Sequence, residues 1–214
     1  MTMLTFSSKW IEIGSMPRFD DTVLREESMV FASTPHYASM HGKVHECFVD
    51  ALPQEWRSND VIIDSRVHML MKGWYPCIPG WHLDDVPRTR PDKQPDHVNP
   101  VYKAEHTMAV IGDASLTEFI QGIVQLPDIP VGQGTIYGKW NEMINRGGHK
   151  VYDIQTVKPS TLYLFDWQAF HRGMPATKFG WRIFIRATKN SQRPHFNECR
   201  KQTQVYLSAP EAGW

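Results

Sequence analysis

From residue 61 onward, short apolar or alternating runs are separated by Pro, Gly, Asn and Asp. Runs of this length, rich in β-branched and aromatic residues, predict strands rather than helices. About eight such strands with few helices between them favour an antiparallel barrel or jelly roll over a parallel α/β fold. The predicted strands fall at 61–63, 66–74 (continuing at 81–84), 106–112, 118–126, 134–137, 151–157, 161–166 and 181–188.

The first sixty residues have a different pattern. Asp20 and Asp21 precede the amphipathic stretch 22–31, which predicts a short helix with acidic residues at its start. Residues 44–52 predict a second short helix that ends near Pro53. We therefore expect a single mainly β (α+β) domain in which N-terminal helices support a β core. The expected divisions are a helical N-terminal support, a β core and a C-terminal extension without a strong pattern, at 1–60, 61–190 and 191–214.

Composition narrows the classes of partner. The 214 residues carry no formal net charge, so no general attraction to nucleic acid or anionic lipid is expected. No apolar run approaches the ~18 residues that span a bilayer, and the N-terminus lacks the pattern of a secretory signal. Three widely spaced cysteines indicate a reducing compartment, hence the cytoplasm. We expect a small-molecule partner and no membrane, and nothing in the pattern sets an oligomeric state.

Three side chains of metal-ligand type stand out: His82, Asp84 and His171. Residues i and i+2 of a strand point to the same face, so His82 and Asp84 should project together. Two imidazoles and one carboxylate form the facial triad that binds Fe(II) and leaves coordination positions open. The alternative is chance, because the chain holds ten histidines and a His-x-Asp pair is common.

Two arginines follow the distal histidine. Arg182 and Arg186 share one face of the predicted strand 181–188, with Phe184 between them. Guanidinium groups on an otherwise apolar strand are costly unless they meet anions. The anion is either the carboxylate of an α-keto acid, clamped by two hydrogen bonds, or an Asp or Glu at the rim of the barrel.

Two further features are candidates for supporting roles. Asp166 lies five residues before His171 and could accept its second ring N–H, or it could simply end a strand. The loop 86–103 carries four prolines among charged residues and is long enough to be a substrate lid.

The motif His82-Leu83-Asp84, the distal His171 and Arg182 together resemble the Fe(II)/2-oxoglutarate-dependent dioxygenase superfamily. Two longer runs resemble its phytanoyl-CoA hydroxylase-like branch. These are Pro-Gly-Trp-His-Leu-Asp-Asp at 79–85 and Leu-Phe-Asp-Trp-Gln-Ala-Phe-His-Arg-Gly at 164–173. The resemblance covers roughly residues 65–190 and is specific for the superfamily rather than for one family within it.

The resemblance implies a double-stranded β-helix (jelly-roll, cupin-like) core. It also implies that His82, Asp84 and His171 are the catalytic iron ligands and that Arg182 binds the distal carboxylate of 2-oxoglutarate. The implied reaction uses O2 to hydroxylate or otherwise oxidise a C–H bond of a small substrate, with release of succinate and CO2. Arg186 would then meet an anionic substrate or take the place of Arg182.

One departure leaves the choice between the arginines open. Many relatives have Ser or Thr two residues after the co-substrate arginine. Arg182 is followed at that distance by Phe184, whereas Arg186 is followed by Thr188. We nevertheless prefer Arg182 as the residue that binds 2-oxoglutarate.

Three other functions remain open. A cupin-type metal-binding module or isomerase would need the triad but no arginine. An oxygenase that modifies a nucleic-acid base or a protein would share the mechanism and differ in partner, but the neutral total charge does not favour a nucleic acid. In a pure interaction domain the His-x-Asp pattern would be accidental.

Overall fold

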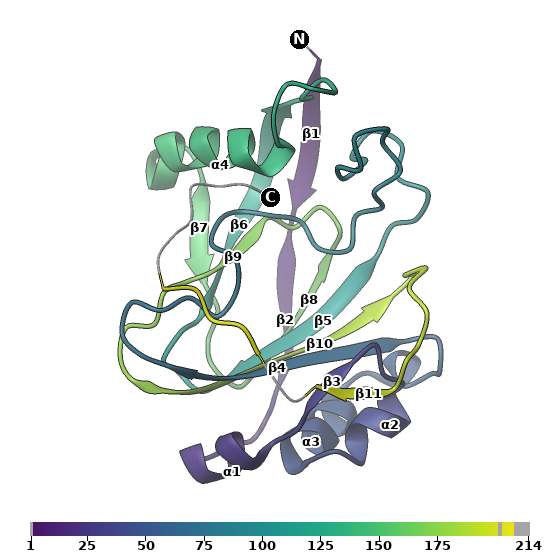
Figure 1. Ribbon diagram of the computed structural model, residues 1–214, viewed down its shortest axis with the longest axis vertical. Coiled ribbons are helices and arrows are strands. Elements are labelled where there is room, and N and C mark those ends of the chain that lie inside the picture. Colours follow the sequence, from purple (N-terminus) through teal and green to yellow (C-terminus); the bar gives the residue numbers. More distant parts are fainter. Residues whose placement is uncertain (1, 201–202, 208–214) are drawn as a thin grey trace.

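Antiparallel sheets dominate the architecture in the computed structural model, which describes residues 2–200 and 203–207 (Figure 1). The larger sheet has the strand order β2-β8-β5-β10-β4. The second has the order β1-β6-β7, with β9 also paired to β6, and β3 pairs with β11. The strands are β1 Met3–Ser8, β2 Trp10–Ser15, β3 Met29–Phe31, β4 Ile62–Leu70, β5 Glu105–Ile111, β6 Thr117–Pro127, β7 Asp153–Thr156, β8 Thr161–Asp166, β9 His171–Gly173, β10 Gly180–Lys189 and β11 Glu198–Arg200.

Aromatic side chains join the two larger sheets. Phe119 on β6 meets Phe165 on β8 at a ring-centroid distance of 5.1 Å and Trp10 on β2 at 5.9 Å. Met108 and Val110 of β5 belong to the same buried cluster. Because successive side chains of a strand alternate between faces, the neighbours of these residues point outward toward the helices.

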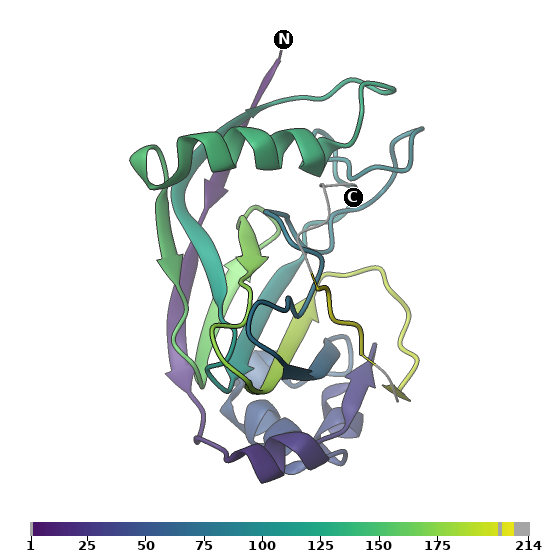
Figure 2. The same cartoon turned by 60° about the vertical axis from the view of Figure 1, so that its left-hand side comes forward.

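Helices cover the outer faces of both sheets (Figure 2). The first three pack on the larger sheet, where Leu24 and Phe48 meet the β10 side chains of Ile183 and Ile185 in one core. The fourth packs on the second sheet through Trp140 and neighbouring apolar residues. The helices are α1 Asp21–Glu26, α2 Pro35–Ser39, α3 Lys43–Ala51 and α4 Ile136–Gly147, with 3₁₀ turns at Gln54–Trp56 and Gly148–Lys150.

The predicted helical N-terminal region is only partly helical. Residues 3–15 form β1 and β2, one strand in each larger sheet, and residues 29–31 form β3 rather than the end of a helix. β3 pairs with β11, about 170 residues later in the chain. Local periodicity carries no information about such a distant partner, so the helix predicted for 22–31 was too long.

Two strand predictions also differ from the structure. Residues 134–137 lead into α4 instead of forming a strand, because Tyr137, Trp140 and Ile144 recur at helical spacing and are buried together. Residues 81–84 form no regular strand, and His82 makes a single bridge to His171. Within the described chain, no helix combines the length and apolar character needed to cross a membrane.

Candidate metal centre

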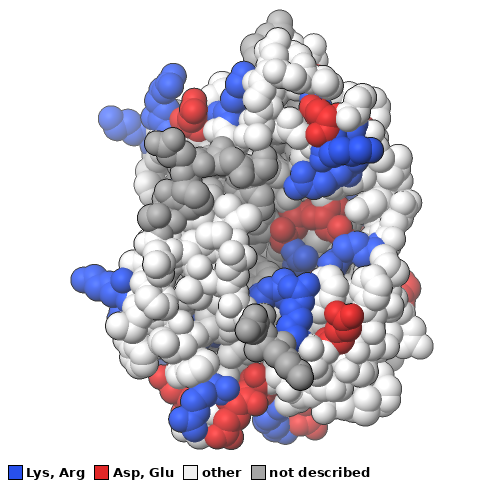
Figure 3. Space-filling view, in the orientation of Figure 1, with Lys and Arg blue, Asp and Glu red and all other residues white. Residues whose placement is uncertain are grey.

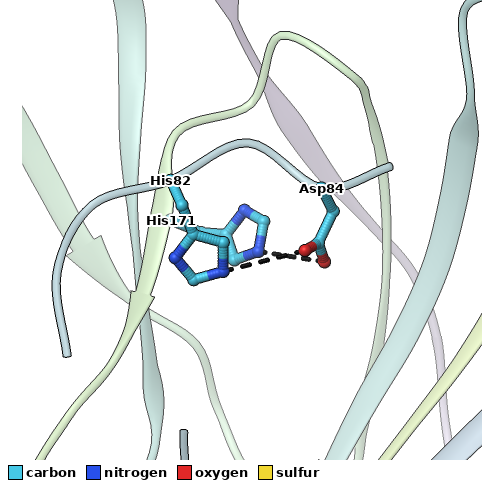
Figure 4. Close-up of side chains that lie close together, drawn as sticks. All are labelled: His82, Asp84 and His171. Carbon is cyan, nitrogen blue, oxygen red and sulfur yellow. Dashed lines mark hydrogen bonds and ion pairs between the residues drawn. The ribbon is translucent and has the colours of Figure 1, made fainter. Parts of the chain in front are cut away.

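The structure brings His82, Asp84 and His171 together from two distant parts of the chain (Figure 4). His82 and Asp84 lie in the connection between β4 and β5, and His171 is the first residue of β9. The backbones of the two histidines exchange hydrogen bonds, with N···O distances of 3.0 and 3.1 Å. This bridge fixes the spacing of the two imidazoles without a full strand ladder.

The possible ligand atoms converge on one point. His171 Nε2 lies 3.2 Å from Asp84 Oδ2, and His82 Nε2 lies 3.7 Å from Asp84 Oδ1. One ligand atom from each residue lies within 4.8 Å of the other two. Three donors at this separation can bind one metal ion from the same side.

The second nitrogen of each ring is already bonded. His82 Nδ1 lies 3.0 Å from the Gly80 carbonyl oxygen, and His171 Nδ1 lies 2.9 Å from that of Ala169. A carbonyl only accepts, so each Nδ1 carries a proton, and Nε2 is the nitrogen that would bind a metal in place of its contact with Asp84. The donor set therefore fits a divalent metal ion of the kind that a facial triad binds.

Asp166 does not take the supporting role considered for it. Its carboxylate accepts a hydrogen bond from the backbone N–H of Gln168 at 2.9 Å, while the Ala169 carbonyl orients the His171 ring. Phe119 and Phe165 pack against that ring, with centroids at 5.1 and 5.3 Å. The ring is thus held by a local turn and by the aromatic core.

Side chains of α4 hold the segment that carries the other two ligands. The amide of Asn141 accepts from the backbone N–H of Trp81 and donates to its carbonyl at 2.9 Å. The Tyr137 hydroxyl donates to the Leu83 carbonyl, also at 2.9 Å. Gly80 has φ +124°, and a Cβ there would lie 2.8 Å from Asn141 Oδ1, so this close approach requires glycine. Side chains of a helix, rather than the backbone of a neighbouring strand, thus hold this segment, which the sequence analysis had predicted to continue a strand.

The charges of the cluster suit metal binding at neutral pH. Burial raises the pKa of Asp84, but Arg186 and the histidines outweigh that effect and hold the pKa well below its usual range. Burial, together with nearby His171, lowers the pKa of His82 to about 4. Asp84 is therefore ionised and His82 neutral at pH 7, which are the forms that coordinate a metal.

The two arginines of β10 have different environments. Arg186 donates to the carboxylate of Asp84 and lies 3.7 Å from Asp64 Oδ2. Arg182 is 3% exposed and donates from Nε to the Ser115 carbonyl at 2.8 Å. No carboxylate of the described residues pairs with it. Burial lowers the pKa of Arg182 to about 10, so it is still a cation at pH 7.

All five of these side chains line one cavity of about 740 Å³. The loop 86–103, proposed from its length as a lid, contributes none of the lining residues. The walls come instead from β4, from residues 76–78 and from the C-terminal part of the chain that showed no pattern. Lining residues that the sequence analysis missed include Asp64, Arg66, His68, Arg193, Arg200, Thr203 and Tyr206.

One signal for the β4 wall was present in the sequence. Asp64, Arg66 and His68 alternate with Ser65 and Val67, which places three polar side chains on one face of a mostly buried strand. The C-terminal wall has no comparable signal, because its contribution depends on the path of the chain after β10.

The chain matches no protein-family profile, no curated protein and no solved structure. The case for a function therefore depends on the motifs and on the geometry of this cavity.

Proposed function

We propose that the protein is an Fe(II)- and 2-oxoglutarate-dependent oxygenase that oxidises a C–H bond of a small substrate and releases succinate and CO2. One observation carries the proposal. The cavity onto which His82, Asp84 and His171 converge also contains Arg182, a buried cation that pairs with no carboxylate of the described residues. A buried cation of this kind is costly unless an anion binds beside it.

The strand order supports a double-stranded β-helix. Between β4 and β10, the strands β4, β5, β8 and β10 belong to the larger sheet, whereas the His82 bridge, β6, β7 and β9 belong to the second. In chain order the segments therefore alternate between the two sheets, except that β6 and β7 follow each other in the second sheet. This arrangement is the one expected of a jelly roll. It places β9, which carries one ligand, beside the segment that carries the other two.

Each residue would have a distinct task. His82, Asp84 and His171 would hold the metal, and Arg182 would bind the distal carboxylate of 2-oxoglutarate by paired hydrogen bonds. When bound, iron and 2-oxoglutarate supply the oxidising power for the C–H bond. Arg186 donates to Asp84 and thereby fixes the orientation of that carboxylate. Arg186 already forms ion pairs with the carboxylates of Asp64 and Asp84. Arg182 is therefore the better candidate to bind 2-oxoglutarate.

The first test is spectroscopic and distinguishes the oxygenase from a cupin-type module. Protein loaded with Fe(II) without oxygen is titrated with 2-oxoglutarate, and we expect the weak visible charge-transfer band of the chelate. Oxygen should then produce succinate. Folded, iron-loaded protein that gives neither band nor succinate would favour the cupin-type metal module.

A substitution then tests the arginine. Arg182→Gln should weaken 2-oxoglutarate binding by about 10- to 100-fold, because a charge-assisted hydrogen bond contributes about 1.5–3 kcal/mol. Fe(II) affinity should change less than about twofold, because Arg182 contacts no metal ligand. The matched control is Lys178→Gln, which removes an exposed cation paired with Asp113. Equal loss of iron and 2-oxoglutarate would make Arg182 structural, and a 2-oxoglutarate defect confined to Arg186→Gln would transfer the role to Arg186.

A further inference from the structure

Among the described residues, the cavity has more cations than its carboxylates can neutralise. In that part of the chain, five arginines line it and two aspartates face them. Basic side chains surround a hollow on the face shown in Figure 3. Asp64 and Asp84 pair with Arg186 and Arg193. The three remaining arginines are Arg66, Arg182 and Arg200.

Arg66 and Arg200 lie on different elements and make few polar contacts. Arg66, on β4, donates from one guanidinium nitrogen to the Ser65 carbonyl at 2.9 Å. Arg200, on β11, places its guanidinium 3.7 Å from the centroid of the Phe31 ring. Neither forms an ion pair with a carboxylate in the part of the chain that the structure describes. Most of their donors therefore have no acceptor among the residues that the structure describes.

The two cations are close enough to affect each other. Burial and then the charge of Arg200 lower the pKa of Arg66. Like charges brought together at a partly buried position destabilise the protein unless an anion bridges them. The Phe31 ring stabilises Arg200 by a cation–π contact, but a ring carries no negative charge that could neutralise the pair.

The strand register places Arg66 at a different position from Arg182, the arginine assigned to 2-oxoglutarate. On the cavity face of β4 and β10, Asp64 lies opposite Arg186, Arg66 opposite Phe184, and His68 opposite Arg182. Arg66 is thus diagonal to Arg182 in the ladder, directly opposite Phe184, whose ring centroid lies 5.7 Å from the Arg182 guanidinium carbon. An anion bound at Arg182 leaves Arg66 and Arg200 for a second anion.

We propose that the primary substrate is a small organic anion whose carboxylate or other oxyanion binds between Arg66 and Arg200. This inference rests on the proposed oxygenase function, because it assigns Arg182 to 2-oxoglutarate. Planar guanidinium groups bind such oxyanions through paired hydrogen bonds. The volume of about 740 Å³ lies in the range of small-molecule sites.

Inorganic sulfate is the probe for this subsite. Protein loaded with Fe(II) and 2-oxoglutarate without oxygen is titrated calorimetrically with sulfate at constant ionic strength, while the visible band is followed. We expect one saturable site and an undiminished band. Arg66→Gln and Arg200→Gln should each weaken sulfate binding by at least about tenfold. Arg25→Gln, which removes an exposed cation of α1, should leave it unchanged.

The outcomes separate this inference from the oxygenase proposal. Absence of the band in iron-loaded protein defeats the oxygenase proposal, whatever sulfate does. If the band forms, the subsite is refuted by non-saturable sulfate binding, by equal weakening in Arg25→Gln, or by sulfate that displaces 2-oxoglutarate. Arg66 is partly buried, so thermal melting must show that its variant is folded. Arg200→Gln provides the second, independent variant.

Discussion

Two histidine–carboxylate clusters lie on opposite faces of β4, and only one of them fits a metal. On the helix side, His45 Nδ1 lies 2.6 Å from Glu27 Oε1, and His45 Nε2 lies 2.8 Å from Ser65 Oγ. On the cavity side, His82 and His171 face Asp84. The residue types are nearly the same, so composition alone cannot distinguish the clusters.

The difference lies in the surroundings of the ring nitrogens. Both nitrogens of His45 are bonded to side chains, and its side chain is completely buried. His82 and His171 use Nδ1 for a nearby carbonyl and direct Nε2 toward the carboxylate of Asp84 beside a cavity. A histidine near a carboxylate is thus a candidate ligand when that contact borders a cavity, where a metal ion can enter between the two groups.

Removal of the cavity carboxylate should have the largest effect. Asp84→Ala should reduce Fe(II) or Mn(II) affinity by about 100-fold or more, because four ligands together contribute about 10–16 kcal/mol in structural zinc sites. Paramagnetic resonance of added Mn(II) measures the free ion directly. The comparison between the clusters fails if metal affinity survives in Asp84→Ala but is lost in Glu27→Ala.

Removal of the helix-side carboxylate should affect stability instead. Glu27→Ala should lower the free energy of unfolding by about 3 kcal/mol, because it leaves a buried ring N–H and a backbone N–H of His45 without an acceptor. Urea denaturation measures this loss. Glu46→Ala, which breaks an exposed pair with Lys43 on the same helix, should change stability by less than about 0.5 kcal/mol.

The smallest expected effect is on the pH dependence of stability, and it comes from a further buried histidine, His97, which has no carboxylate partner among the described residues. His97 packs against Phe6, Tyr137 and Trp140, and neither ring nitrogen has a partner among the described residues. Burial lowers its pKa from 6.5 to about 3. Between these values the unfolded chain binds more protons than the folded one, so its contribution to stability falls as pH drops below 6.5.

The test compares the wild type with His97→Phe. Between pH 7 and pH 5 the wild type should lose about 2 kcal/mol more stability than the variant, as the linkage relation gives for a single group with this shift. Urea denaturation at both pH values measures the difference, and all other histidines are common to both proteins. A stability difference that is independent of pH would show that His97 is not responsible.

The candidate metal cluster could be predicted in part because His82 and Asp84 are only two residues apart and His171 follows an apolar strand segment. Residue type and spacing alone left chance as an alternative, and the longer motifs around these residues favoured a metal site. Most strands of the β core were predictable because their signal is local. The wall formed by Arg200 was not, because it depends on the pairing of β11 with β3, which are far apart in the chain.

The α4 side chains that hold residues 81–83 could not be predicted from local sequence patterns either. Asn141 and Tyr137 were not recognised, because the type and spacing of a polar side chain give no sign that it will bond the backbone of residues 81–83, more than fifty positions earlier. Tyr137 was instead assigned to a predicted strand at 134–137, where the structure has the start of a helix.

The attachment of residues 80–83 to α4 makes one helix responsible for two of the three ligands. The segment shares a single bridge with a strand, so both sheets can keep their pairing if it detaches. Local opening of this kind requires far less free energy than global unfolding. Substitutions on the outer face of the molecule, remote from the cavity, should therefore change how readily a metal ion binds to this candidate centre and leaves it.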